Sequence, residues 1–190
     1  MYGSVKVWQG IITLPTWTTG AEDPNPMFLE KRVYQGSSGN VYPYGVIDTL
    51  TGEREMRDYQ AVWMENDFIR IMLLPELGGR IHRAYDKVKQ RDFVYYNEVV
   101  KPALVGLLGP WISGGIEFNW PQHHRPTTFM LVDFSIQCGE NGVQTVWMGE
   151  AEPMRGLQVM TGFTLYPDRA LIEITGKVFN GNATPRHFLW

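Results

Sequence analysis

The residues best suited to binding or catalysis form one stretch near the middle of the chain, residues 114–126. It reads Gly-Gly-Ile-Glu-Phe-Asn-Trp-Pro-Gln-His-His-Arg-Pro, so a carboxylate, two amides, two aromatic rings, two imidazoles and a guanidinium lie close together along the chain. A polyhydroxylated ligand is typically held by a few placed polar groups against aromatic walls. The 114–126 motif therefore predicts the wall of a binding site.

Two other classes of site use the same residues. The carboxylate of Glu117 and the two motif histidines, joined by His82, could bind a metal ion on a β-sandwich, as in cupins. Adjacent histidines on a strand point in different directions, so this arrangement requires a bend. The aromatic residues could instead form a non-catalytic protein-interaction surface. Each motif residue alone is also compatible with a core or turn position. The variety of polar groups in one short span favours a small ligand, and no metal or cofactor is predicted.

Composition limits the partners. The chain has 190 residues, a net charge of −3 and no cluster of Lys and Arg, so nucleic acid is not a predicted partner. A single cysteine, Cys138, cannot form an internal disulfide. No apolar stretch approaches the roughly 18 to 20 residues of a membrane span, and the N-terminus lacks the pattern of a secretory signal. We expect a cytoplasmic protein that binds neither nucleic acid nor membrane.

Short alternating segments separated by turn residues predict an all-β, antiparallel β-sandwich. The Asn141-Gly142 pair is a strong hairpin signal. In the segment 80–86, alternation would place Ile81, Arg83 and Tyr85 on one face. Residues 97–113 contain too much Pro and Gly for more than one helical turn, so they are expected to be a loop that brings Trp111 beside the motif. The predicted strands are residues 5–14, 59–64, 68–74, 80–86, 92–96, 128–137, 143–150, 157–166 and 170–179, with one more opening at residue 185.

We expect one β-sandwich domain over residues 1–190, with residues 16–31 as a loop or linker because they are rich in Thr, Gly, Asp and Pro. Tyr42 and Tyr44 either pack on a sheet or lie at the rim of the site. The chain ends in residues 186–190, the apolar start of a strand without a turn or polar tail, which would leave an exposed edge. This predicts the N-terminal part of a longer protein, with self-association or the C-terminal remainder covering the edge.

Three segments together resemble the N-terminal half of the galactose-mutarotase-like proteins: residues 73–81, 93–96 and 114–126. They are more closely similar to a bacterial branch, the domain of unknown function 5107 family, which is often joined to tetratricopeptide repeats. The resemblance covers nearly the whole chain. It implies an incomplete supersandwich, a mono- or oligosaccharide as the ligand, and an aldose 1-epimerase-like activity in the full-length protein.

The resemblance also implies roles for individual residues. In this superfamily a proline–histidine segment places a histidine near the bound sugar, and the match is Pro121 with His123. Arg125 lies close by, as in the hexose-phosphate epimerases. The residue after that histidine is usually glycine, whereas this chain has His124. The substrate-binding residues expected from motif and resemblance together are His123, Arg125, Glu117, Asn119, Trp120, Arg80 and Trp111.

Catalysis by the superfamily needs an acid and a base for the anomeric centre. In the relatives a histidine acts as the acid, and its position falls at or just beyond Trp190. The glutamate that acts as the base lies further on. We therefore expect the 190-residue chain to be inactive. The alternative is that Glu117 acts with His123 or His124, which makes Glu117 and His124 the catalytic candidates.

Overall fold

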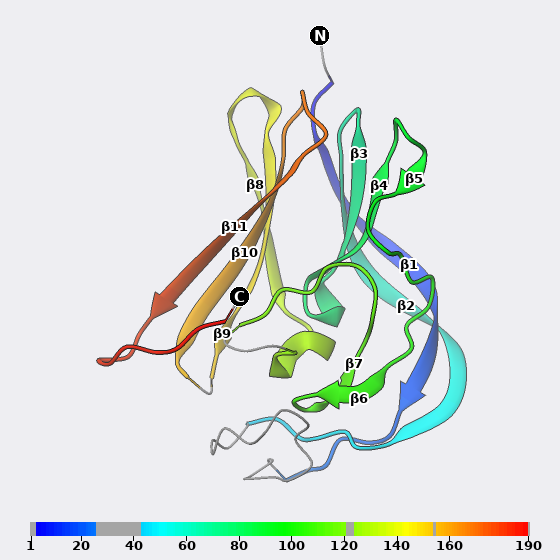
Figure 1. The fold of residues 1–190 in the computed structure, drawn as a ribbon, viewed down its shortest axis with the longest axis vertical. Helices are drawn as coiled ribbons and strands as arrows, with labels where there is room; N and C mark the ends of the chain where they lie inside the picture. Colours follow the sequence, from blue (N-terminus) through cyan, green and yellow to red (C-terminus); the bar gives the residue numbers. More distant parts are fainter. Residues whose placement is uncertain (1–2, 26–42, 121–123, 154, 190) are drawn as a thin grey trace.

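The computed structural model describes residues 3–25, 43–120, 124–153 and 155–189, and nearly all their regular structure is β (Figure 1). The prediction of an all-β, antiparallel fold is confirmed. Two large sheets face each other, and two short 3₁₀ helices, Pro75–Leu77 and Pro126–Phe129, lie between them (Figure 1). The strands are β1 (Lys6–Thr19), β2 (Leu50–Glu65), β3 (Ile69–Leu74), β4 (Arg80–Asp86), β5 (Arg91–Asp92), β6 (Ala103–Gly106), β7 (Gly109–Trp111), β8 (Asp133–Cys138), β9 (Gln144–Glu152), β10 (Leu157–Leu165) and β11 (Ile172–Asn180), and the 3₁₀ helices are η1 (Pro75–Leu77), η2 (Pro126–Phe129) and η3 (Glu140–Gly142).

Both large sheets are antiparallel meanders in which neighbours in sequence are neighbours in space. The first sheet has the order β1-β2-β3-β4-β5, the second has the order β11-β10-β9-β8, and β6 pairs only with β7 in the described residues. Asn141 and Gly142 take φ values of 53° and 77° in the tight turn between β8 and β9. Two successive positive φ angles are what an Asn-Gly hairpin turn requires.

The main hydrophobic core lies between the two sheets. Val62 and Ile71 of the first sheet belong to the same buried cluster as Val146 and Phe163 of the second. A second cluster, which includes Met72, lies on the other face of the first sheet and is covered by the segment that leads to β7. Because β3 is covered on both faces, its sequence is an almost continuous apolar run.

β1 continues through Pro15 to Thr19, so the predicted strand end at residue 14 is wrong. The loop predicted for residues 16–31 begins no earlier than Gly20, and residues 26–31 lie outside the described part of the chain. Proline is tolerated because β1 is at the edge of its sheet. The carbonyl of Pro15 accepts a hydrogen bond from the N–H of Val100 (2.9 Å), on the side away from β2.

Several other boundaries differ from the sequence prediction. Of the expected 92–96 strand only Asp92 lies in a strand, the two-residue β5 that pairs with β4. The expected loop 97–113 contains the β6–β7 hairpin. The strand expected to begin at residue 128 begins at Asp133 as β8, because Pro126–Phe129 form η2. Residues 185–189 are not a strand. The β6–β7 tip is fixed by distant contacts, since Leu107 and Leu108 are buried with Val46.

A β-bulge changes the faces of β4. Met72 pairs with Arg83 and Leu73 pairs with Ile81, so His82 is the extra residue. Ile81 therefore packs in the main core, whereas Arg83 points to the other face. Simple alternation is wrong at this position.

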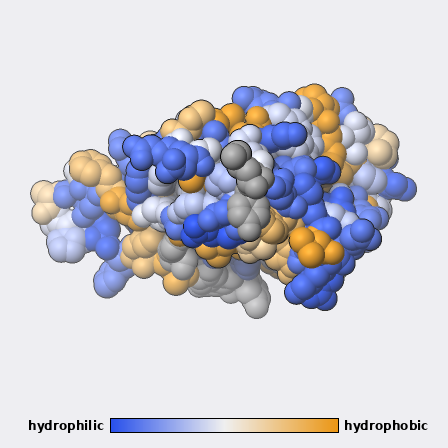
Figure 2. Space-filling view, turned by 90° about the horizontal axis from the view of Figure 1, so that it is seen from above, coloured by the Kyte–Doolittle hydropathy of each residue, from blue (hydrophilic) through white to orange (hydrophobic). Residues whose placement is uncertain are grey.

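One face of the molecule is mainly polar, although large hydrophobic side chains such as Ile11 and Tyr95 are exposed on the described surface. Figure 2 shows hydrophilic residues over most of the face seen from above, with hydrophobic residues in separate patches. Among the residues that the structure describes, no helix is long and apolar enough to cross a membrane.

Candidate functional site

A glycine pair holds the 114–126 motif against β4. Gly114 and Gly115 have φ values of 89° and 66°. A Cβ at Gly115 would lie 2.1 Å from the carbonyl oxygen of Ile81, so only glycine permits this approach. Ile116 then forms an antiparallel bridge with Ile81, with an N–H to O distance of 2.8 Å. This contact fixes the position of the rest of the motif.

Glu117 is the centre of a cluster of side chains, which we call the Glu117 cluster: Trp111, Glu117, Asn119, His124 and Thr128. Glu117 Oε2 accepts a hydrogen bond from Trp111 Nε1 (3.0 Å) and lies 2.9 Å from His124 Nδ1. Its Oε1 accepts a hydrogen bond from Thr128 Oγ1 (2.6 Å). Thr128 is not among the predicted site residues, because the sequence pattern places it in a strand. In the structure it lies in η2, which brings its hydroxyl to the carboxylate.

Burial raises the pKa of Glu117, but the hydrogen bonds from Thr128, Trp111 and His124 outweigh burial and hold this pKa below its usual value. An ionised carboxylate only accepts hydrogen bonds, so Nδ1 of His124 carries the proton. The carboxylate thus fixes both the tautomer and the orientation of the imidazole. Such a pair can exchange a proton with a ligand hydroxyl.

His124 has an unusual backbone. Its φ is 45°, in the left-handed region, where a side chain costs about 1 to 2 kcal/mol relative to glycine. Its N–H donates to Asn119 Oδ1 (2.9 Å), and its ring packs against Trp111 with 4.9 Å between centroids. Residues held in strained conformations cluster at functional sites. Glycine at position 124 would make the turn itself more stable. The strained backbone therefore indicates that the imidazole side chain is what this position requires.

Arg125 and Trp120 lie in the interior, with 1% of each residue exposed. The Arg125 guanidinium stacks on Trp120 at 3.7 Å from the ring centroid. It donates to the backbone carbonyls of Phe118 and Gly78 and to Thr127 Oγ1 (2.9 Å). These donors are directed at the protein, so the two residues hold the motif in place.

Glu150 on β9 completes this buried network. Its Oε1 accepts hydrogen bonds from Trp120 Nε1 (2.8 Å) and Thr127 Oγ1 (2.6 Å), and it lies 3.8 Å from Arg125 Nε. Burial also raises the pKa of Tyr44, with a further contribution from the charge of Glu150. The motif is thus anchored to the second sheet as well as to the first. Tyr42 lies outside the described residues.

Arg80 supports the motif from within. It is 3% exposed, and it donates to the carbonyls of Ile112 (2.9 Å) and Gly114 (2.5 Å). Burial lowers the pKa of Arg80 to about 10, and the charge of Glu117 opposes this shift. The structure therefore brings Glu117, His124, Trp111 and Asn119 together and places Arg80, Trp120 and Arg125 in buried supporting positions. His123 lies outside the described residues.

Comparison with known proteins identifies the family. A family model described as "Domain of unknown function (DUF5107)" matches residues 37–190. The chain belongs to the DUF5107 family. Its fold is similar to the crystal structure of a TPR-domain containing protein from Parabacteroides distasonis ATCC 8503, with a TM-score of 0.74 and 20% sequence identity over 94% of this chain. The chain spans 29% of that protein's length, and at this identity the likeness shows the fold alone.

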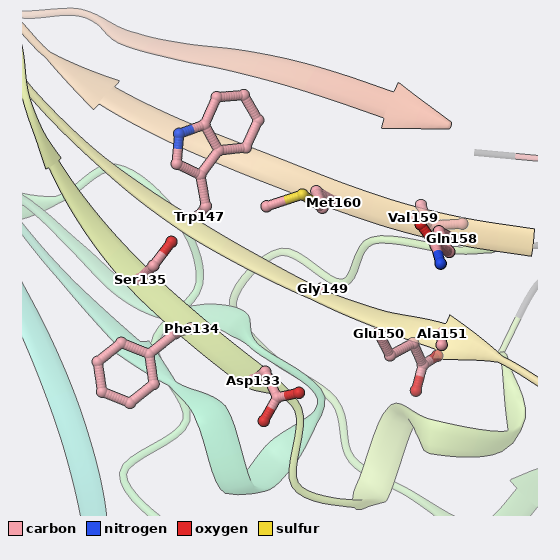
Figure 3. Close-up of a pocket in the computed structure, with 10 residues that line it drawn as sticks. All are labelled: Asp133, Phe134, Ser135, Trp147, Gly149, Glu150, Ala151, Gln158, Val159 and Met160. Atoms are coloured by element: carbon pink, nitrogen blue, oxygen red, sulfur yellow. The ribbon is translucent and has the colours of Figure 1, made fainter. Parts of the chain in front are cut away.

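The DUF5107 chain also has a hollow of about 280 Å³ on the second sheet (Figure 3). Gly149, which has no side chain, lies between Trp147, Met160, Ser135 and Asp133 in this view. Trp147 Nε1 donates to Gln137 (2.8 Å), so the indole is fixed. Glu150 also borders this hollow, which is a second place where a small polar ligand could meet an aromatic ring.

His82, the additional histidine of the metal alternative, is fully buried in the DUF5107 chain. Its ring meets the Tyr96 ring edge-on, with 5.5 Å between centroids. Burial and, to a smaller extent, the charge of Arg80 lower the pKa of His82 to about 4, while the backbone of Asn97 opposes the shift. Within residues 3–25, 43–120, 124–153 and 155–189, no group of three or more His, Cys, Asp or Glu side chains is placed to bind a metal ion.

The buried imidazole predicts acid sensitivity. Between pH 6.5 and about 4 the unfolded chain binds a proton at His82 that the folded chain does not, so stability falls as pH falls through this window. We expect this group to remove about 2 kcal/mol of unfolding free energy between pH 7 and pH 4.5. Urea unfolding of wild type and His82→Phe at both pH values checks this. The variant should lose less stability than wild type, and an equal loss contradicts the assignment.

Proposed function

We propose that this DUF5107 domain binds carbohydrate at the Glu117 cluster. The observation that carries the proposal is the three-way hydrogen bonding of the Glu117 carboxylate beside the partly exposed rings of Trp111 and His124. Sugars offer hydroxyl groups to carboxylates and imidazoles, and their C–H faces pack on indole rings. The cluster supplies all three kinds of group within one small region.

The motif's resemblance to galactose-mutarotase-like proteins supports the same ligand class. It also suggests where chemistry would occur in a full-length protein, namely at the anomeric carbon. Interconversion of anomers needs a base for the anomeric hydroxyl and an acid for the ring oxygen. In the described residues the cluster offers one carboxylate–imidazole pair, Glu117 with His124. We therefore assign binding to this chain, and propose an aldose 1-epimerase-like reaction only for the intact protein.

His124→Gly gives a sharp test, because glycine suits a φ of 45° while removing the imidazole. We expect the variant to unfold at the same temperature as wild type or higher, and to bind sugar at least tenfold more weakly. Isothermal titration with D-glucose, D-galactose and a disaccharide such as lactose measures affinity, and thermal unfolding confirms the fold. Wild-type affinity in a stable His124→Gly variant would exclude the cluster as the site.

Asp133→Asn is the matched control, since it removes a carboxylate charge from the hollow on the second sheet. We expect this variant to bind sugar as wild type does. If Asp133→Asn weakens binding and His124→Gly does not, the sugar binds in that hollow instead. Absence of binding to every sugar tested would contradict the proposed function and leave a protein-interaction role for the aromatic residues.

A further inference from the structure

Besides the Glu117 cluster and the hollow on the second sheet, the protein has a hollow of about 370 Å³ on the first sheet, which we call the arginine hollow. Its volume is at the lower end of the range for small-molecule sites, about 300 to 1,000 Å³. It shares no lining residue with the Glu117 cluster. The side chains that matter for its chemistry are Trp63, Arg70, Met72, Arg83, Tyr85 and Tyr96.

Two arginines occupy diagonal positions on one face of this sheet. Arg70 pairs with Tyr85 and Met72 pairs with Arg83, so the two guanidinium groups project from neighbouring positions of β3 and β4. Residues at diagonal positions lie within reach of long side chains, so one anion between the two groups could accept hydrogen bonds from both.

The carboxylates nearby use only some of the N–H groups of the two arginines. Arg70 Nε pairs with Glu65, and Arg83 donates to Asp92 from Nε (2.8 Å) and Nη2 (3.2 Å). Glu65 also accepts a hydrogen bond from Lys87 Nζ (2.7 Å). These contacts set three cationic side chains against two carboxylates. Among the described residues, both Nη groups of Arg70 and Nη1 of Arg83 have no hydrogen-bond partner.

Aromatic rings form the walls of the arginine hollow. The Arg83 guanidinium lies 4.6 Å from the Tyr96 ring centroid and 5.4 Å from that of Tyr85. The Trp63 ring is stacked on Trp8, with 5.8 Å between centroids and 8° between planes, so it is held in one orientation. Rings fixed in this way provide contact area at a small entropic cost when a flat ligand packs on them.

We propose that the arginine hollow binds a ring compound that carries a carboxylate. The carboxylate would accept hydrogen bonds from the remaining N–H groups of Arg70 and Arg83, since guanidinium and carboxylate match in shape and charge. The ring would pack against Trp63, Tyr85 and Tyr96. A neutral ligand would offer these N–H groups weaker acceptors than a carboxylate does. This site is separate from the Glu117 cluster and does not depend on the proposed function.

Two acids with different rings test the proposal and identify the ligand source. D-glucuronate carries a saccharide ring and benzoate an aromatic ring, and D-glucose and benzamide are their neutral counterparts. We expect one or both acids to bind wild type at least tenfold more tightly than the matching neutral compound, as measured by NMR titration of the chain. Glucuronate alone indicates an acidic sugar, and benzoate alone an aromatic acid. Equal binding of acid and neutral compound, or no binding of either acid, overturns the proposal.

Arg70→Gln removes the carboxylate-binding group while Glu65 keeps its contact with Lys87, so the fold should persist. We expect at least a tenfold loss of acid binding. Arg57→Gln is the matched control: Arg57 is on the same sheet, its side chain is 50% exposed compared with 52% for Arg70, and it also lies near a glutamate, but it does not line the hollow. It should bind the acid as wild type does. Equal losses in the two variants would indicate non-specific charge attraction and overturn the proposal.

D-glucose is a probe of both sites, so D-glucuronate is compared with D-glucose in His124→Gly, in which the Glu117 cluster should no longer bind sugar. Acid binding is tested with Arg70→Gln, and neutral sugar binding with His124→Gly. A domain that binds neutral sugars and no acid would keep the proposed function and lose this inference. Retained acid binding in His124→Gly would confirm that the acid does not occupy the Glu117 cluster.

Discussion

Replacement of Arg125 by methionine is expected to lower the free energy of unfolding by about 3 to 5 kcal/mol. Methionine keeps a long apolar side chain but has no donors. The carbonyls of Gly78 and Phe118 would lose their hydrogen bonds, and the carboxylate of Glu150 would lose its cationic neighbour. The stacking on Trp120 would lose its charge component as well. Guanidinium chloride unfolding measures the change.

Arg169→Met provides the control for the same chemical change at the surface. Arg169 is 52% exposed at its side chain, pairs with Asp168 at 2.8 Å and lies over Tyr166. Exposed pairs of this kind contribute little, so we expect a much smaller change in the free energy of unfolding than for Arg125→Met. If the two arginine variants lose equal amounts of unfolding free energy, the buried network around the motif stabilises the fold no more than a surface ion pair does. Its role would then be in ligand binding.

Alanine at Asn66 is expected to cost about 3 to 4 kcal/mol of unfolding free energy, because four backbone groups lose a partner. Asn66 is 3% exposed. Its Nδ2 donates to the carbonyls of Tyr166 (2.7 Å) and Arg169 (2.9 Å), and its Oδ1 accepts from the N–H groups of Phe68 (2.9 Å) and Ile69 (2.8 Å). One side chain thus joins the β2–β3 turn to the β10–β11 turn. Urea unfolding measures the loss.

Asn66→Asp separates the two halves of this contact. Aspartate still accepts from the turn N–H groups, but it presents an oxygen to the two carbonyls across the sandwich, so we expect it to be at least as destabilising as alanine. Asn25→Ala is the control, since Asn25 is exposed and, within the described part of the chain, its side chain bonds to nearby Asp23. A small effect of Asn66→Asp together with a large effect of alanine would show that the turn bonds alone carry the stabilisation.

The polar groups of the motif divide between two roles. Glu117 and His124 form a partly exposed pair, whereas Arg125 and Trp120 are directed inward to backbone carbonyls and Glu150. Burial of a guanidinium is tolerated only when its donors are satisfied, and here the protein satisfies them. Arginine and tryptophan are residue types that suit ligand recognition. In this protein they instead attach the motif loop to the β-sandwich. Composition alone does not distinguish these two uses.

The all-β antiparallel class and the main hairpins could be predicted from the amino-acid sequence, because alternation and turn chemistry are local properties. The position of the 114–126 motif could also be recognised from the sequence, since the motif combines a glycine pair with a concentration of polar side chains. Local pattern did not predict that β1 passes through Pro15, because edge position depends on which strand is the last in the sheet. It also did not predict the bulge at His82, which depends on the register with β3.

Contacts between distant segments determine which candidate side chains are buried and which are partly exposed. Trp120 is buried because Glu150, 30 residues later, accepts its hydrogen bond, and Thr128 joins Glu117 because η2 turns the chain back. Arg70 and Arg83 share a hollow because β3 and β4 pair in one register. The physical reason is the same in each case. Burial and hydrogen-bond partnership are set by contacts between segments far apart in the sequence, whereas strand and turn preference are set by neighbours.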